Sequence, residues 1–333
     1  MTVPGTRAKE AARQIRTLLP EIPAKSGTDP TSYYWNSTPR LPALPAHLHQ
    51  KLRSAVISGD PIDVARDWQN YSFQSNAPPE STYNFPPTFL QAAQPGAALD
   101  SSHALAGCRA PPVYRTSIVN GGITNRVLML NTANHRIPGG EWEQGVLAQE
   151  ENTARRSNLV QVLVSLDPAS GRQTYYPLAG SSGVYSPNVV IFREGSEGNY
   201  IAWPPEEWTV VSVVSVSSVC RPKLDESGAH YSFQAERDLQ HEKMRTILRI
   251  AALNGHVNLV LGGFGSADPR QNSTGLHRNP VGEVAAMWKD LLFEDWEFKG
   301  WFRNVVFAFN SGGDGWMEET SNTIENEFKK YFG

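Results

Sequence analysis

The chain has 333 residues, of which 40% are hydrophobic and 19% are charged, and its formal net charge is −3. This size and composition predict a globular protein with one large domain, or with one domain and an appended region. No dense block of Lys and Arg is present, which argues against direct nucleic-acid binding. The sequence contains no run of about 18 apolar residues, so we expect neither a membrane-spanning helix nor a membrane partner.

The two cysteines, Cys108 and Cys220, show neither the spacing of a metal site nor a disulfide framework. This cysteine usage indicates a reducing compartment, and the N-terminus lacks an apolar segment of the length that a signal peptide needs. We therefore expect a cytoplasmic or nuclear protein, and we expect a monomer. No cluster of His and Asp is evident for a metal ion, and no cofactor is expected.

The first third of the chain differs in character from the rest. Residues 8–19 carry apolar side chains at the spacing of an amphipathic helix. From about 20 to 115 the sequence is rich in Pro, Ser, Asn and Tyr, and its frequent aromatic residues distinguish it from low-complexity sequence. We interpret residues 1–115 as an irregular accessory segment wrapped on the core, with short helices at 46–57 and 60–70.

After residue 120, short apolar strands alternate with helices. Strands are predicted at 126–131, 188–194, 208–216, 257–265 and 304–310, and helices at 148–166, 232–255 and 279–294. This alternation is typical of an α/β sheet that is covered by helices on both faces. We therefore expect residues 116–333 to form one α/β domain. Ligands of such sheets bind beyond the carboxyl ends of the strands, where two glycine-rich loops follow the first and the fourth predicted strand.

The segment "IPGGEWEQGVLAQEEN", residues 137–152, combines a Gly-Gly pair with two adjacent acids. Successive glycines let backbone N–H groups approach an anion, and a helix N-terminus adds a partial positive charge. Adjacent helical residues point about 100° apart, so one carboxylate can face a ligand while the other supports the loop. On these residues alone, an ordinary turn before an acidic helix start is the favoured alternative. The segment is neither a P-loop nor a dinucleotide-binding fingerprint.

The longer segment "LNTANHRIPGGEWEQGVLAQEEN" resembles the signature of poly(ADP-ribose) glycohydrolases, especially of the microbial type. That family carries an Asn five residues before a Gly-Gly-Gly stretch, and Gln-Glu-Glu six to eight residues after it. Here Asn134 stands five residues before Gly139, and seven residues separate Glu141, at the third-glycine place, from Gln149. "VYSPNVVIFRE" and the segments 245–265 and 279–292 resemble later parts of the family, so the resemblance covers roughly residues 120 to 310.

The resemblance implies a three-layer α/β/α, macrodomain-like fold with a mixed sheet that binds ADP-ribose or ADP-ribosylated protein. It implies that Glu151 is the catalytic acid and base, and that Glu150 holds the ribose or a neighbouring hydroxyl. Gln149 would then orient the loop. The implied ligand-binding residues of the first loop are Asn131, Asn134, Gly139, Gly140 and Glu141. No metal ion is implied.

Further ligand contacts are implied downstream. Gly263, Phe264 and Gly265 match the second phosphate loop, with Phe264 at the place of an aromatic residue near the distal ribose. Tyr185 packs either near the adenosine or in the core. In the same longer loop, Arg270, His277 and Arg278 either meet phosphates or are solvated charges.

The sequence departs from the family at Glu141 and in the length of the second loop, residues 262–280. A carboxylate about 4 Å from a phosphate charge is repelled by roughly 1 kcal/mol in water and roughly 4 kcal/mol at an effective dielectric of 20. A positive φ at this position would cost roughly 1 kcal/mol more. Three alternatives therefore stay open: an ADP-ribosyl glycohydrolase, a non-catalytic ADP-ribose reader, and either a hydrolase of another ADP-ribose derivative or nucleotide sugar or an interaction protein. The first requires Glu151 to lie in a closed, desolvated cleft.

Overall fold

The computed structural model describes residues 4–44, 46, 49–74, 126–267, 277–310 and 315–332. Within this part, seven strands form a mixed sheet in the order β1-β4-β5-β3-β6-β9-β2. The strands are β1 (Tyr33–Trp35), β2 (Arg53–Ser58), β3 (Leu128–Thr132), β4 (Gly183–Ile191), β5 (Thr209–Val216), β6 (Asn258–Leu261) and β9 (Asn304–Phe309). Strand β4 runs antiparallel to both of its neighbours, and β5, β3, β6, β9 and β2 are parallel to one another. A separate short pair joins β7 (Ser266–Ala267) and β8 (Asn279–Pro280).

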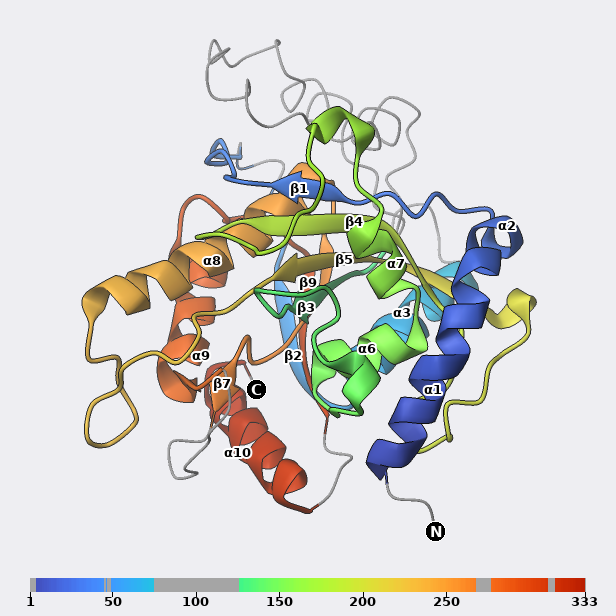
Figure 1. Cartoon of the computed structure of the whole chain (residues 1–333). Helices are drawn as coiled ribbons and strands as arrows, with labels where there is room; N and C mark the ends of the chain where they lie inside the picture. Colours follow the sequence, from blue (N-terminus) through green and yellow to red (C-terminus); the bar gives the residue numbers. More distant parts are fainter. Residues whose placement is uncertain are drawn as a thin grey trace.

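Helices cover both faces of this sheet (Figure 1). One face carries α8 (Gln234–Leu253), α9 (Val281–Lys289) with its continuation Asp290–Glu294, and α10 (Gly315–Phe332). The other side carries α3 (Pro61–Gln74), α6 (Gln149–Arg156) and α7 (Leu159–Val164), with α1 (Pro4–Leu18) packed beside α6 and followed by α2 (Ile22–Ser26). The predicted α/β fold with a mixed sheet is confirmed.

The strands read as continuous apolar runs because both of their faces are buried. Leu128 and Leu130 of β3 pack into the core beneath α8 and α9, whereas Met129 packs into the core on the side of α3 and α7. This alternation follows from the two-residue period of a strand. The rigid sheet fixes the carboxyl ends of β3, β5 and β6 side by side, at the edge where the two glycine loops leave it.

The predicted helix at 46–57 is wrong, because residues 53–58 form strand β2. This strand pairs in parallel with β9, from Arg53 opposite Asn304 to Ser58 opposite Phe309. At the other edge of the sheet β1 pairs with β4. The described part of the predicted accessory segment therefore supplies both edge strands, and α3 confirms its second helix. The predicted boundary at residue 115 lies outside the described residues.

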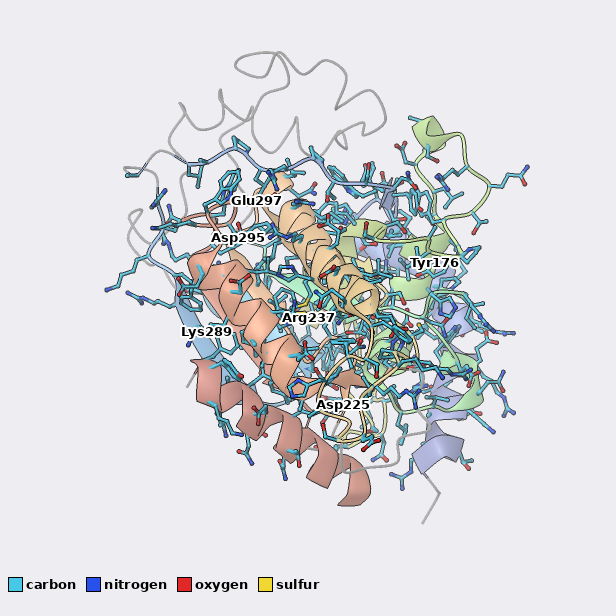
Figure 2. All side chains as sticks on the ribbon, turned by 90° about the vertical axis from the view of Figure 1, so that its left-hand side faces the viewer. Tyr176, Asp225, Arg237, Lys289, Asp295 and Glu297 are labelled. Carbon is cyan, nitrogen blue, oxygen red and sulfur yellow. The ribbon has the colours of Figure 1, made fainter. Side chains whose placement is uncertain are left out.

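A buried carboxylate fixes the N-terminal segment to the face that carries α8. Glu297 accepts hydrogen bonds from the backbone N–H of Leu41 (3.0 Å) and from the guanidinium groups of Arg249 (2.7 and 3.0 Å) and Arg245 (2.9 Å). Glu297 is fully buried, so its charge requires these partners (Figure 2). The segment between β1 and β2 is thereby anchored to the core.

The predicted helix at 148–166 is interrupted, because Ser157 is extended (φ −144°, ψ 175°) and forms a bridge with Ile191 at the end of β4. Asn158 reinforces the break, since its side-chain oxygen accepts the N–H of Val190 at 2.7 Å. Helix α6 is therefore a short element that is tied to the sheet at its C-terminus. The other predicted helices and strands after residue 120 correspond to observed elements with shifted ends. Among the described residues, no helix has the length and apolarity to cross a bilayer.

Candidate active site

The first glycine loop, residues 133–148, connects the carboxyl end of β3 to the amino end of α6. Gln149 joins the two elements. Its side-chain nitrogen donates to the carbonyl of Leu130 at 2.7 Å, and its side-chain oxygen accepts the N–H of Thr132 at 3.3 Å. These bonds fix the first turn of α6 against the end of β3. The positions of Glu150 and Glu151, which follow Gln149, are fixed as a result.

Glu150 is 4% exposed, and its carboxylate binds backbone N–H groups of the first glycine loop. Its Oε1 accepts the side-chain N–H of Asn131 and the backbone N–H of Gly139, both at 3.2 Å, and its Oε2 accepts the backbone N–H of Asn134 at 2.6 Å. Burial, aided by the charge of Glu151, raises the pKa of Glu150 to about 8, although the three N–H donors oppose this shift. Glu150 thus positions both ends of the segment from Asn134 to Gly139.

Glu151 is 8% exposed and contacts the following part of the loop. Its Oε1 accepts the backbone N–H of Glu141 at 3.1 Å. Gly140 lies directly against it, because a Cβ placed on Gly140 would be 2.3 Å from the same oxygen. Gly139 and Gly140 have φ values of +77° and +59°, so the sequence needs glycine here for conformation and for space. The two carboxylates therefore diverge, as expected for adjacent helical residues.

Glu141 adopts an ordinary backbone conformation, with φ −93° and ψ 38°. The backbone cost expected for a positive φ is therefore absent at this position. Its side chain is exposed, while its N–H faces Glu151. The third-glycine place thus tolerates a side chain, which is directed away from the buried carboxylates.

The exposed charge of Glu141 is expected to weaken the binding of an anionic ligand. Replacing Glu141 with Gln should strengthen the affinity for ADP-ribose, the ligand that the sequence resemblance implies, about two- to fivefold at low ionic strength, because it removes a repulsion of up to about 1 kcal/mol. The gain should shrink in high salt. Isothermal titration calorimetry checks this, with Glu206→Gln as a control that removes the same charge from an exposed turn. An affinity that is equal in both variants at low salt would contradict a ligand near Glu141.

Two amide side chains, one buried and one partly buried, lie at the start of the loop. Asn131 is fully buried at the end of β3, and besides Glu150 its side-chain N–H donates to Ser215 Oγ at 3.1 Å. The side-chain oxygen of Asn134 accepts the N–H groups of Arg136 (2.8 Å) and Ile137 (3.3 Å), which closes a tight turn. The structure thus brings Asn131, Asn134 and both carboxylates together.

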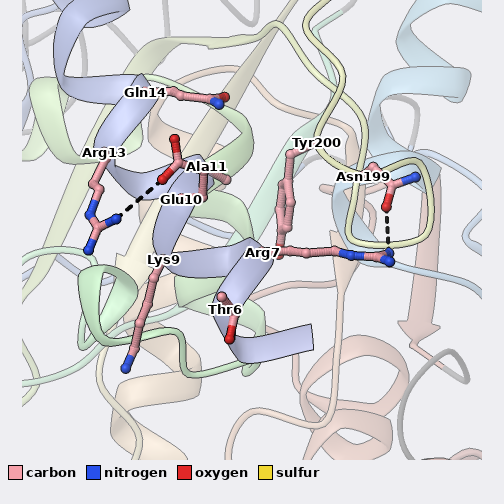
Figure 3. Close-up of a pocket in the computed structure, with 9 residues that line it drawn as sticks. All are labelled: Thr6, Arg7, Lys9, Glu10, Ala11, Arg13, Gln14, Asn199 and Tyr200. Atoms are coloured by element: carbon pink, nitrogen blue, oxygen red, sulfur yellow. Dashed lines mark hydrogen bonds and ion pairs between the residues drawn. The ribbon is translucent and has the colours of Figure 1, made fainter. Parts of the chain in front are cut away.

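The outer part of the loop is held by Arg155, which sequence reasoning did not single out. Arg155 is fully buried and donates to the carbonyls of Trp142 (2.8 Å) and Val146 (2.5 Å), and to the hydroxyl of Tyr200 (3.3 Å). Tyr200 also borders a hollow of about 460 Å³ beside α1, whose lining includes neither Glu150 nor Glu151 (Figure 3). The sequence around Arg155 contains no motif that indicates that this residue holds the loop.

The second glycine loop departs from the prediction at Phe264. Its ring is 1% exposed and lies 6.3 Å from the ring of Trp288, inside the core beneath α9. Phe264 is therefore a core residue and does not present its ring at the loop surface. Gly265 (φ +75°) approaches the end of β5 so closely that a Cβ would lie 2.1 Å from Ser218 Oγ. Gly263 precedes it in a turn, since its carbonyl accepts the N–H of Ser266 at 3.0 Å.

The cationic residues of this loop are only partly described. His277 Nδ1 lies 2.7 Å from Ser218 Oγ, and burial lowers the pKa of His277 to about 4. Arg278 is partly buried. Arg270 lies outside the described residues. A neutral His277 that is bonded to Ser218 acts as a support of the loop rather than as a solvated charge.

Tyr185 is not brought to the glycine loops. It is 2% exposed, and its hydroxyl lies 2.8 Å from Nε2 of His256, which precedes β6. The side chain therefore points toward the amino ends of the parallel strands. Core packing, and not contact with the adenosine, explains this residue.

Residues 109–194 match the family model described as microbial-type PARG, catalytic domain. This region thus matches the poly(ADP-ribose) glycohydrolase family. The match includes the whole first glycine loop together with Glu150 and Glu151, and it ends before the second loop. The predicted resemblance to microbial poly(ADP-ribose) glycohydrolases is confirmed. No curated protein matches the chain.

Solved structures of poly(ADP-ribose) glycohydrolases resemble the whole fold. The enzyme from Thermomonospora curvata is 20% identical, with a TM-score of 0.59, over 98% of this chain and 99% of that chain. The same enzyme bound to the inhibitor ADP-HPD is 19% identical, with a TM-score of 0.57, over 98% of each chain. The enzyme from Deinococcus radiodurans in complex with ADP-ribose is 18% identical, with a TM-score of 0.53, over 94% of this chain and 99% of that chain. At these identities the similarity shows the fold.

Proposed function

We propose that the protein is an ADP-ribosyl glycohydrolase, which cleaves the ribosyl O-glycosidic bond of poly- or mono-ADP-ribose attached to protein. The observation that carries the proposal is the position of Glu151. Its carboxylate is shielded from water at the amino end of α6 and touches the Gly-Gly loop, within the region that matches the poly(ADP-ribose) glycohydrolase model. A general acid and base works best in such a shielded site.

In the proposed reaction, Glu151 donates its proton to the leaving oxygen as the bond to the ribose C1″ breaks. The electron pair of that bond leaves with the oxygen, and an oxocarbenium-like ribose remains. The resulting Glu151 carboxylate then takes a proton from a water molecule, whose oxygen attacks C1″. Free ADP-ribose is released and Glu151 is protonated again, so the step is balanced without a metal ion or cofactor.

The backbone of the first loop supplies the rest of the proposed site. Gly139 and Gly140 would lie along the diphosphate and the distal ribose, because only a backbone without side chains leaves room beside Glu151. Asn131 and Asn134 would meet ribose hydroxyls. Glu150 would act through the loop, since its oxygens already accept three N–H groups.

The second loop and two residues of the first complete the proposed contacts. The backbone of Gly263 and Gly265, in the second glycine loop, would contact the diphosphate of the ligand. Gln149 acts as a positioning residue, and Glu141 contributes its N–H to Glu151 rather than a side chain to the ligand. Phe264 and Tyr185 have no part in the proposed site, because both rings are buried in the core.

The test is the release of free ADP-ribose from automodified polymerase and from mono-ADP-ribosylated peptides, measured by mass spectrometry. We expect release from at least one of the two substrates, and the ratio of the two rates gives the preference between polymer and single units. Tight binding of ADP-ribose without any release would identify a reader. A protein that neither binds nor releases ADP-ribose would refute the proposal.

A further inference from the structure

Asp60 lies where the N-terminal segment meets the candidate active site. It follows β2, whose end is fixed to the sheet because the N–H of Gly59 donates to the carbonyl of Phe309 at 2.7 Å. Asp60 also caps α3, since its Oδ1 accepts the N–H of Ile62 at 3.1 Å. The carboxylate of Asp60 therefore has a fixed position between an edge strand and a helix.

The second oxygen of the same carboxylate binds α6. Oδ2 of Asp60 accepts a hydrogen bond from the side-chain nitrogen of Asn152, the residue that directly follows Glu151. Oδ2 also lies 3.5 Å from the guanidinium group of Arg156, which is fully buried and therefore requires carboxylate partners. One carboxylate thus joins α3 to α6, which lie side by side in Figure 1.

The bond to Asp60 fixes the middle of α6. Gln149 fixes the first residue of the helix against β3, and Ser157 bridges to β4 just beyond its last residue. Asp60 binds between these two ends, one residue after Glu151. Side chains reach about 5–6 Å from a helix axis, so a rotation of roughly 10° moves a carboxylate by about 1 Å. Such a movement would lengthen the 3.1 Å contact between Glu151 and the N–H of Glu141 beyond hydrogen-bond distance.

We propose that Asp60 is a positioning residue of the active site, which keeps Glu151 in place through the side chain of Asn152. The inference rests on the proposed function, in which Glu151 transfers the proton. The N-terminal segment, which the sequence predicts to be accessory, then contributes to catalysis. Because Asp60 acts through α6 and does not touch the ligand, its loss should slow the reaction and leave the binding of ADP-ribose unchanged.

The first test compares the single-turnover release of ADP-ribose with the affinity for ADP-ribose in the Asp60→Asn variant. The new side chain keeps an oxygen for the N–H of Ile62, but its amide nitrogen faces two donors, Asn152 and Arg156. We expect release to be about 10- to 100-fold slower, because a displacement of about 1 Å can cost about 10²-fold in rate. The affinity should stay within about threefold of the wild type. An unchanged rate, or an equal loss of rate and affinity, would overturn the inference.

A reciprocal exchange tests the bond itself. In the double variant Asp60→Asn/Asn152→Asp, the amide at position 60 can donate to the carboxylate at position 152, and the pair keeps one negative charge beside Arg156. The exchange should restore the rate to within about fivefold of the wild type. A double variant that is no faster than Asp60→Asn contradicts the proposal. Asn152→Ala removes the same bond and leaves the cap of α3 intact, so it carries the test if Asp60→Asn does not fold.

Asp63→Asn is the matched control. Asp63 binds the same guanidinium group, with its Oδ2 2.9 Å from Arg156, but it lies within α3 and not at its cap. The control should lower the melting temperature, because a buried Arg loses a charged partner, and it should keep its rate within about threefold. If the control slows the release as much as Asp60→Asn does, a general loss of stability explains both variants and the inference is wrong.

Amide hydrogen exchange separates this inference from the proposed function. The N–H of Glu141 should exchange faster in Asp60→Asn than in the wild type, because its bond to Glu151 is weakened, and at the wild-type rate in Asp63→Asn. Unchanged exchange in Asp60→Asn overturns the positioning role even if the wild type hydrolyses its substrate. Faster exchange supports this role even if the wild type releases no ADP-ribose, a result that would overturn the proposed function alone.

Discussion

Replacing Glu151 with Gln is expected to slow the release of ADP-ribose about 10²- to 10⁴-fold, which is the usual contribution of a positioned general acid and base. Gln keeps an oxygen that can accept the N–H of Glu141, so the loop should stay in place. It carries no proton that it can transfer to the leaving oxygen. The affinity for ADP-ribose should therefore change by only a few-fold, as measured by titration of the same preparation.

The matched control for this change is Glu143→Gln in the same loop. Glu143 forms an ion pair with Arg16 at the surface, and its side chain is 38% exposed. Because surface ion pairs contribute little, this control should keep its rate within about twofold. Single-turnover rates on the better substrate give the comparison. If Glu151→Gln retains a rate within about tenfold of the wild type, Glu151 does not transfer the proton.

Replacing Gly140 with Ala is the second change for which we expect a large effect. The added Cβ would lie 2.3 Å from Oε1 of Glu151, and the carboxylate has to move because it is the flexible partner. A displacement of about 1 Å at a reacting group can cost about 10²-fold in rate. The positive φ adds a destabilisation of roughly 1–2 kcal/mol.

Gly171→Ala is a control that separates the two effects of Gly140→Ala, which are the displacement of Glu151 and the strain of a positive φ. Gly171 has a similar φ of +65°, but a Cβ there would meet no atom within 4 Å. The control should therefore lose stability by roughly 1–2 kcal/mol and keep its activity. Thermal denaturation and the release assay, run on both variants, check the expectation. Equal activity losses in both variants would mean that backbone strain, and not displacement of Glu151, impairs Gly140→Ala.

The core of the candidate site was predictable because it is local in sequence. The glycine pair, Gln149 and the two acids lie within 13 residues, and a helix start next to a strand end brings them together. Helical geometry alone requires that Glu150 and Glu151 diverge. Which carboxylate faces which part of the loop was not predictable, because hydrogen bonds to Asn131, Asn134 and Gly139 decide it.

The positions of two aromatic side chains could not be predicted from the local sequence. Phe264 belongs to a glycine-rich loop that the sequence predicts to bind the ligand. The backbone conformation of Phe264 (φ +42°) instead directs its ring into the core, where it contacts Trp288. Tyr185 lies near the start of β4, where the parallel strands end, yet its hydroxyl bonds to His256 at the amino ends of those strands.

The sequence by itself determined the alternation of strands and helices, the place of both glycine loops, and the acidic start of α6. These features depend on periodicity and on the conformational freedom of glycine, which act over a few residues. The tertiary structure alone decided that residues 53–58 are an edge strand, that Arg155 holds the loop, and that Glu141 has a negative φ. The physical reason is that strand pairing, burial of charge and the direction of a side chain depend on partners that are distant in the chain.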